Sequence, residues 1–114
     1  MSALDLALRY MEIFYSGREP DRLQSILHTD LQFRGPFVQF DSAQDYIASV
    51  EADPPVGCSY RLLNAFENEN VANLLYEFSK QGITTTMSQL FEVQNDKITR
   101  IVLIFDSAVF AGKE

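Results

Sequence analysis

The chain has 114 residues, 9 of them basic and 16 acidic, and its formal net charge is −7. This length fits a single domain, 1–114, and a hydrophobic content of 46% excludes a disordered chain. The negative charge argues against binding to nucleic acid or to an anionic membrane, since both are polyanions. Because Cys58 is the single cysteine and there is one histidine, we expect no disulfide, no metal and no cofactor.

We expect a cytoplasmic protein. The N-terminal residues lack the basic and apolar segments of a targeting signal, because Asp5 precedes any apolar run. The longest aliphatic run, 101–105, is too short to span a bilayer.

The first predicted element is an amphipathic helix over 3–16. Apolar residues recur there three and four positions apart, which is the spacing of one helix face. Ser2 and Asp5 form an N-cap pattern, and Gly17 supplies the stop. Asp5 and Arg9 have the spacing of an i, i+4 ion pair.

Two further helices are expected before residue 57. The shorter one opens with Pro20 in its first turn and extends to residue 27. The other begins at Asp41 or Ser42 and is ended by Asp-Pro-Pro at 53–55, because proline cannot continue a helix.

The strands are predicted from residues that alternate between two faces. One strand, or bent strand, covers 30–38 and bends at Gly35 and Pro36. From residue 57 onward the period is two, and short turns force four more strands into antiparallel pairs. These strands cover 58–67, 71–80, 83–93 and 97–106. The order of elements predicts an α+β fold with helices on one face of a strongly curved sheet.

Three segments are similar to those of a known superfamily. They are Arg-Tyr-Met at 9–11, Leu-His-Thr-Asp-Leu-Gln-Phe-Arg-Gly-Pro-Phe at 27–37, and 97–106, which begins Lys-Ile-Thr-Arg and ends Phe-Asp. Together with the order of elements, they resemble the nuclear-transport-factor-2-like superfamily and its SnoaL-like branch, relatives of ketosteroid isomerases and polyketide cyclases. The resemblance implies three N-terminal helices packed in the concave face of a curved, mostly antiparallel sheet, a cone-like α+β barrel.

The resemblance also implies an apolar, aromatic-lined pocket that binds a small hydrophobic molecule bearing a carbonyl or hydroxyl. The residues that it places in this pocket are Tyr10, Phe14, Phe33, Phe37, Tyr76, Met87, Gln89, Phe91, Leu103 and Phe105. Tyr10, Tyr76 and Gln89 would donate hydrogen bonds to the ligand, and Tyr10 matches the tyrosine that binds the developing enolate oxygen in ketosteroid isomerases. The alternative is a filled core in which the Tyr10 hydroxyl is satisfied locally.

The positions of the acids and bases in the related enzymes lack titratable groups here. Gly35 occupies the position of the isomerase base, and Gln89 that of its second donor. Leu103 occupies the acid–base position of the cyclases, so no catalytic residue is assigned. Two alternatives stay open: an enzyme with an unrecognised pair such as His28 and Asp106, and a non-catalytic dimerisation or adaptor module.

The last predicted strand is apolar on both faces. Ile101, Leu103 and Phe105 alternate with Val102 and Ile104. Only one face can serve the pocket, and the helices cover that same side. We therefore expect a second copy of the chain to cover the other face in a two-fold homodimer.

Overall fold

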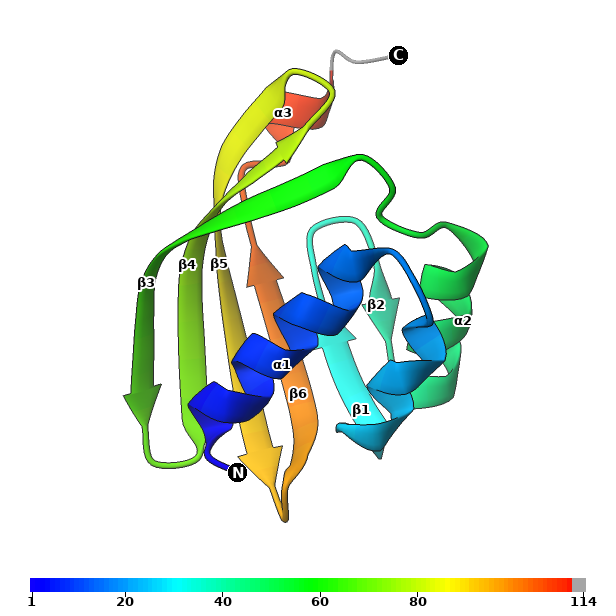
Figure 1. Ribbon diagram of the computed structural model, residues 1–114, viewed down its shortest axis with the longest axis vertical. Helices are drawn as coiled ribbons and strands as arrows, with labels where there is room; N and C mark the ends of the chain where they lie inside the picture. The colour runs from blue at the N-terminus through cyan, green and yellow to red at the C-terminus, as the bar shows by residue number, and fades with distance from the viewer. Residues whose placement is uncertain (112–114) are drawn as a thin grey trace.

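The computed structural model, which describes residues 1–111, is a six-stranded sheet with its main helices on one face (Figure 1). In chain order the elements are α1 (Ala3–Ser16), the 3-10 helix η1 (Pro20–Ser25), β1 (Leu27–Arg34), β2 (Gln39–Phe40), α2 (Ala43–Ala52), β3 (Cys58–Asn68), β4 (Val71–Lys80), β5 (Ile83–Gln94), β6 (Lys97–Ile104) and α3 (Ala108–Ala111). The α+β class predicted from the sequence is confirmed.

The strands lie in the order β2-β1-β6-β5-β4-β3. β3 to β6 pair antiparallel through hairpins, whereas β1 runs parallel to β6, so the sheet is mostly antiparallel as expected. β2 has two residues and pairs with β1. The two edge strands, β2 and β3, are not paired with each other, so the curved sheet stays open and does not close into a barrel.

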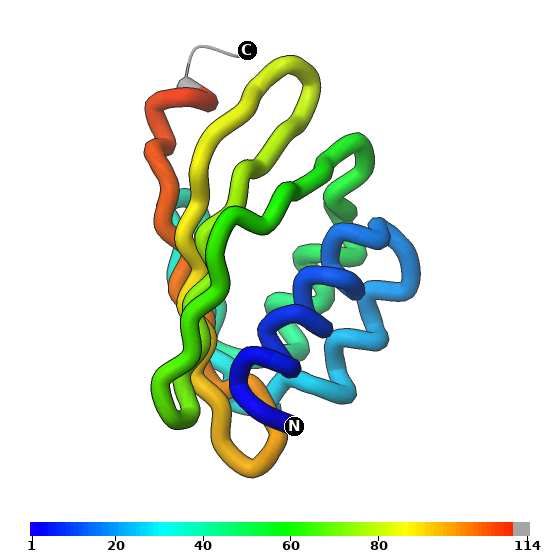
Figure 2. Tube along the Cα trace, turned by 60° about the vertical axis from the view of Figure 1, so that its left-hand side comes forward, coloured from blue at the N-terminus to red at the C-terminus, as the bar shows by residue number. Residues whose placement is uncertain are grey.

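The helices pack against the concave face of this sheet. Figure 2 shows α1, η1 and α2 together on one side of the strands. α1 contacts β3 to β6, and α2 contacts β1, β2 and η1. Leu6 and Met11 of α1 are buried in the same core as Leu74 of β4 and Ile101 of β6. No helix among residues 1–111 has the length and apolar character needed to cross a membrane.

The larger differences from the predicted element boundaries are at three places. η1 is a 3-10 helix that ends at Ser25, so β1 begins at residue 27 and not at 30. β1 ends at Arg34, before the predicted bend. β6 ends at Ile104, because Asp106 leaves the strand to accept a hydrogen bond from the Ala108 amide at 3.0 Å. This contact begins α3, a short helix that the sequence did not predict.

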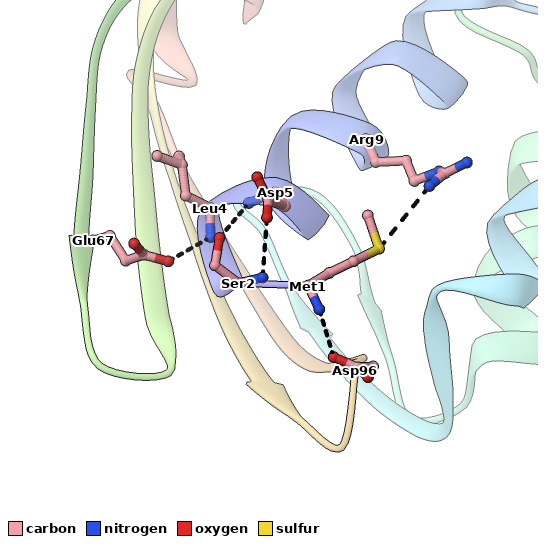
Figure 3. Close-up of polar contacts among 7 residues, drawn as sticks. All are labelled: Met1, Ser2, Leu4, Asp5, Arg9, Glu67 and Asp96. Carbon is pink, nitrogen blue, oxygen red and sulfur yellow. Dashed lines mark hydrogen bonds and ion pairs between the residues drawn. The ribbon is translucent and has the colours of Figure 1, made fainter.

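The N-terminus of α1 is tied to two hairpin turns (Figure 3). The Ser2 and Asp5 side chains each accept a hydrogen bond from the other's backbone amide, which makes the predicted N-cap a full capping box. The Leu4 amide donates to Glu67 at 3.0 Å, and the Met1 ammonium pairs with Asp96 at 3.0 Å. The expected ion pair between Asp5 and residue 9 does not form, because the Asp5 carboxylate is used in the cap.

Replacing the capping residue tests how much this end of α1 contributes to stability. Ser2→Ala removes the acceptor for the Asp5 amide and should lower the free energy of unfolding by about 0.5–2 kcal/mol. Urea denaturation measures the change. Ser59→Ala, an exposed serine of β3 outside any cap, is the control and should change stability much less. Equal losses in the two variants would contradict a specific role for the cap.

Candidate functional site

An open cavity of about 530 Å³ is lined by residues of α1, α2, α3 and all six strands. Eleven of its lining residues are aromatic: Tyr10, Phe14, Tyr15, Phe33, Phe37, Phe40, Tyr46, Tyr76, Phe78, Phe105 and Phe110. The lining residues that are exposed to solvent mark its mouth: Pro36, Phe37, Val38, Ser49, Asp53 and Gln81. A volume of this size is usual for a small-molecule site.

The structure brings nine of the ten predicted pocket residues to the wall of this cavity. These are Tyr10, Phe14, Phe33, Phe37, Tyr76, Met87, Gln89, Leu103 and Phe105. Phe91 is the exception, since it is buried in the core and does not border the cavity. Its ring meets the Tyr10 ring edge-on, with centroids 5.2 Å apart, so Tyr10 borders the cavity in its place.

Four buried polar side chains on the cavity wall form what we call the polar cluster: Tyr10, Tyr46, Tyr76 and Gln89. The hydroxyls of Tyr10 and Tyr46 are hydrogen-bonded to each other and join α1 to α2. The Tyr76 hydroxyl donates to Gln89 Oε1 at 2.7 Å and joins β4 to β5. Gln89 is the one buried side chain among residues 1–111 that is neither apolar nor aromatic.

Four near-parallel rings, which come from α1, α2 and β1, form part of the cavity wall. The plane of the Tyr10 ring makes an angle of 9° with that of Phe14 and of 20° with that of Tyr46. Tyr46 lies 16° from parallel to Phe33, with ring centroids 4.8 Å apart. Ring stacking of this kind adds to the free energy of burial and fixes the positions of the side chains.

Burial keeps the phenols of the cavity uncharged. Removal from water raises the pKa of Tyr10 well above its usual value, and Tyr46 raises it further, while the Gln89 amide acts in the opposite direction. Burial also raises the pKa values of Tyr46, Tyr76 and Tyr15. None of these hydroxyls is a phenolate near neutral pH.

Among residues 1–111, the charged groups on the cavity wall are Asp53 and Lys80, which lie at its outer part. Near them is Cys58, whose thiol pKa is raised by burial, lowered by Lys80 and raised by Asp53. The thiol is therefore not an activated nucleophile. Within residues 1–111, no three His, Cys, Asp or Glu side chains are grouped so as to hold a metal ion.

His28 and Asp106 are not brought together. Both are exposed and neither lines the cavity. β1 runs parallel to β6 with Leu27 opposite Ile98, so His28 lies beside the start of β6, whereas Asp106 follows the end of that strand. The two side chains are at opposite ends of the sheet, and they do not form an acid–base pair.

Comparison with solved structures places this arrangement among known folds. An NTF2-like protein of unknown function from Cytophaga hutchinsonii is 22% identical and has a TM-score of 0.80, over 95% of this chain and 93% of that one. A candidate ketosteroid isomerase from Kribbella flavida is 14% identical with a TM-score of 0.80, over 91% and 77%. A candidate SnoaL-like polyketide cyclase from Jannaschia sp. CCS1 is 10% identical with a TM-score of 0.78, over 96% and 92%.

The protein has the NTF2-like fold. The fold that the sequence motifs implied is thus supported by the whole backbone. No family model matches the sequence, and no curated protein is similar to it in sequence. At these identities the likeness concerns the fold, and it assigns none of the neighbours' activities to this chain.

The sequence analysis missed several residues of the cavity wall. They are Tyr15, Phe40, Tyr46, Phe78 and Phe110, among others. Tyr46 matters most, because it supplies the partner of the Tyr10 hydroxyl. Its place on the buried face of the helix that begins near Ser42 was a signal, since a buried tyrosine hydroxyl needs a partner.

The raised tyrosine pKa values predict sensitivity to alkali. The unfolded chain ionises its tyrosines near pH 10, whereas the folded chain keeps the buried ones protonated. The stability that these groups contribute is therefore complete below about pH 9 and is lost as the pH rises above about 10. Urea denaturation at a series of pH values measures this decline.

Tyr46→Phe has one buried phenol fewer and serves as the comparison for this experiment. Its stability should decline less steeply, by at most about 1.4 kcal/mol per pH unit. The phenolate absorbance of the folded protein provides a second measurement. Ionisation of all five tyrosines near pH 10 without unfolding would contradict the burial argument.

Proposed function

We propose that this NTF2-like protein binds a small, mainly apolar molecule that bears a carbonyl or hydroxyl group. The observation that carries the proposal is the 530 Å³ cavity, with its eleven aromatic lining residues and its charged groups confined to the outer wall. Apolar walls with a few placed polar groups are the usual composition of small-molecule sites. A core filled by its own side chains would leave no space of this size.

The polar cluster supports binding better than acid–base catalysis. Proton abstraction needs a base within hydrogen-bond reach of the substrate, and the phenols and amide of the cluster are uncharged near neutral pH. Gly35 and Leu103, at the positions of the related bases, both line the cavity and cannot titrate. We also propose that the protein is cytoplasmic, which agrees with its single cysteine, since disulfide-linked cysteine pairs are typical of oxidising compartments.

Cys58 offers a direct test of the proposed binding, because it is the single cysteine and lies on the cavity wall. A bound ligand should slow alkylation of its thiol by iodoacetamide and raise the midpoint of thermal unfolding. The compounds to test are fused-ring hydrocarbons, ketones and alcohols, including steroid-like ones. A compound that slows alkylation without raising the midpoint would indicate binding at the thiol alone.

Phe14→Trp is a matched variant for the same experiment. It adds volume to the cavity wall without introducing charge, so it should weaken binding and restore the alkylation rate. Failure of every compound to raise the midpoint in the wild-type protein would contradict the proposed function.

We further propose that the protein forms a two-fold homodimer through the convex face of the sheet. Phe66, Leu90 and Val102 occupy one row across this face, where Phe66 pairs with Asn73, Asn73 with Leu90 and Leu90 with Val102. Phe66 is 58% exposed and Ile104 is 59% exposed, although both are large apolar side chains. The helices that cover the concave face leave this face without a cover, which favours a second copy of the chain.

Light scattering at micromolar concentration tests the dimer. The wild-type protein should have twice the 13.0 kDa mass of the chain. Ile104→Glu places a charge in the proposed interface and should give the monomer mass. Val56→Glu, which changes a 71% exposed apolar residue away from the sheet, should leave the dimer intact. A monomeric wild-type protein would contradict the proposal.

A further inference from the structure

The cavity is longer than it is wide. The residues of β5 that line it are Ile83, Met87 and Gln89. Ile83 and Gln89 are six residues apart, or about 20 Å at about 3.3 Å per residue of strand. Spread over that length, a volume of 530 Å³ gives a mean cross-section of about 26 Å², close to the square of the spacing between neighbouring strands. The cavity is therefore a narrow slot that follows β5.

The two ends of this slot are lined by different groups. At the lower end Gln89, a member of the polar cluster, pairs with Leu103 of β6. At the upper end, toward the β4–β5 hairpin, Ile83 pairs with Lys80 of β4, which pairs in turn with Cys58 of β3. These three side chains all border the cavity. The Cys58 thiol thus marks the end of the slot that is farther from Gln89.

The upper part of the slot has no strand on its β6 side. β6 ends at Ile104, which pairs with Ser88, so residues 83–87 of β5 pair with β4 alone. α3 contacts β5 and contributes Phe110 to the cavity wall. Figure 1 shows α3 at the upper end of the sheet, beside the β4–β5 hairpin. A single turn of helix therefore takes the place of a strand in this part of the wall.

Phe110 is the ring that connects the sides of the upper wall. Its centroid lies 5.4 Å from that of Phe105, 6.1 Å from that of Phe78 in β4, and 6.0 Å from that of Phe37 in the β1–β2 connection. Among residues 1–111, the hydrogen bonds of α3 join only neighbours within 106–110. A substitution at Phe110 therefore changes the wall without breaking a hydrogen bond of the sheet.

The rings along the slot change orientation from its lower to its upper end. At the lower end the Tyr46 ring lies within 20° of parallel to those of Tyr10 and Phe33. At the upper end the Phe110 ring makes angles of 65° with Phe78 and 76° with Phe37. A rigid flat molecule cannot lie flat against both sets of rings, whereas a chain with rotatable bonds can turn between them.

We infer that the ligand is a long unbranched chain that lies along β5, and that Phe110 is the residue that selects for its length. The inference rests on the proposed function and narrows it, because it favours a long chain over a compact fused-ring compound. A long chain buries methylene groups against Phe110 and Phe78, whereas a short chain ends before it reaches them. Each methylene group buried there should improve affinity about three- to fourfold.

The test uses the neutral ketones 2-hexanone, 2-decanone and 2-tetradecanone, with 9-fluorenone as the compact ketone. Their dissociation constants are measured by tyrosine fluorescence, and the alkylation of Cys58 by iodoacetamide is measured with each ketone at saturation. In the wild-type protein 2-tetradecanone should bind most tightly and protect the thiol most. 2-Hexanone and fluorenone should raise the midpoint of thermal unfolding but protect the thiol less, because they end before the upper part of the slot.

Variants of α3 then test the assignment to Phe110. Phe110→Ala should weaken the binding of 2-tetradecanone about tenfold, the effect of about two buried methylene groups, and change that of 2-hexanone less than about twofold. Phe110→Leu should restore most of the affinity for the long ketone. Val109→Ala, in the same turn but not on the cavity wall, is the control and should leave the preference for length unchanged.

The outcomes separate this inference from the proposed function. Equal protection of Cys58 by the short and long ketones, or tighter binding of fluorenone than of 2-tetradecanone, overturns the long-chain ligand and leaves the proposed function in place. This comparison uses the wild-type protein, so it holds even if a variant does not fold. An equal loss for both chain lengths in Phe110→Ala, or as large a loss in Val109→Ala, overturns the role of Phe110. Failure of every ketone to bind overturns both proposals.

Discussion

A polar group buried among apolar side chains must find a hydrogen-bond partner, and the interior of this protein is arranged around that constraint. The hydroxyls of Tyr10 and Tyr46 satisfy this requirement by hydrogen bonding to each other, and this bond joins α1 to α2 above the sheet. Tyr76 of β4 and Gln89 of β5 satisfy it in the same way, since the Tyr76 hydroxyl donates to the Gln89 side chain. Because no buried side-chain nitrogen or oxygen in residues 1–111 is left without a partner, the two pairs hold the wall of the cavity without destabilising the core.

The open sheet explains why a cavity persists beside this cluster. β1 to β6 curve around the helices, yet the edge strands β2 and β3 do not pair with each other, so the rim of the sheet beside the cavity stays open. Phe37, Phe105 and Phe110 meet edge-on at this rim, with Phe37 still 64% exposed. The closely packed core lies lower, where α1 covers Leu74 and Phe91. Packing is thus complete at one end of the sheet and incomplete at the other.

Sequence periodicity predicted most of the fold but only part of the site. The period-two pattern placed β4 at 71–80 as observed, and the alternation along β5 put Met87 and Gln89 on the cavity side. The alternation could not show that Phe91 lies outside the cavity, because the ring that covers Phe91 is that of Tyr10 in a different element, α1. Nor could it pair Tyr10 with Tyr46, since 36 residues separate them and their meeting depends on how α1 and α2 cross. α3 escaped prediction because its start depends on a single contact from Asp106.

The position of Gly35 shows why acid–base chemistry does not fit this cavity. A Cβ atom added there would lie 3.3 Å from the Phe33 ring and 3.8 Å from the Leu103 side chain, so a carboxylate could enter only if the ring moved. Phe33 is in turn stacked on Tyr46, the partner of Tyr10. Making room for a base would therefore shift a ring that packs on the hydrogen-bond partner of Tyr10. The same contacts that keep the cavity uncharged keep its donors in place, and this combination favours recognition of a neutral molecule over removal of its proton.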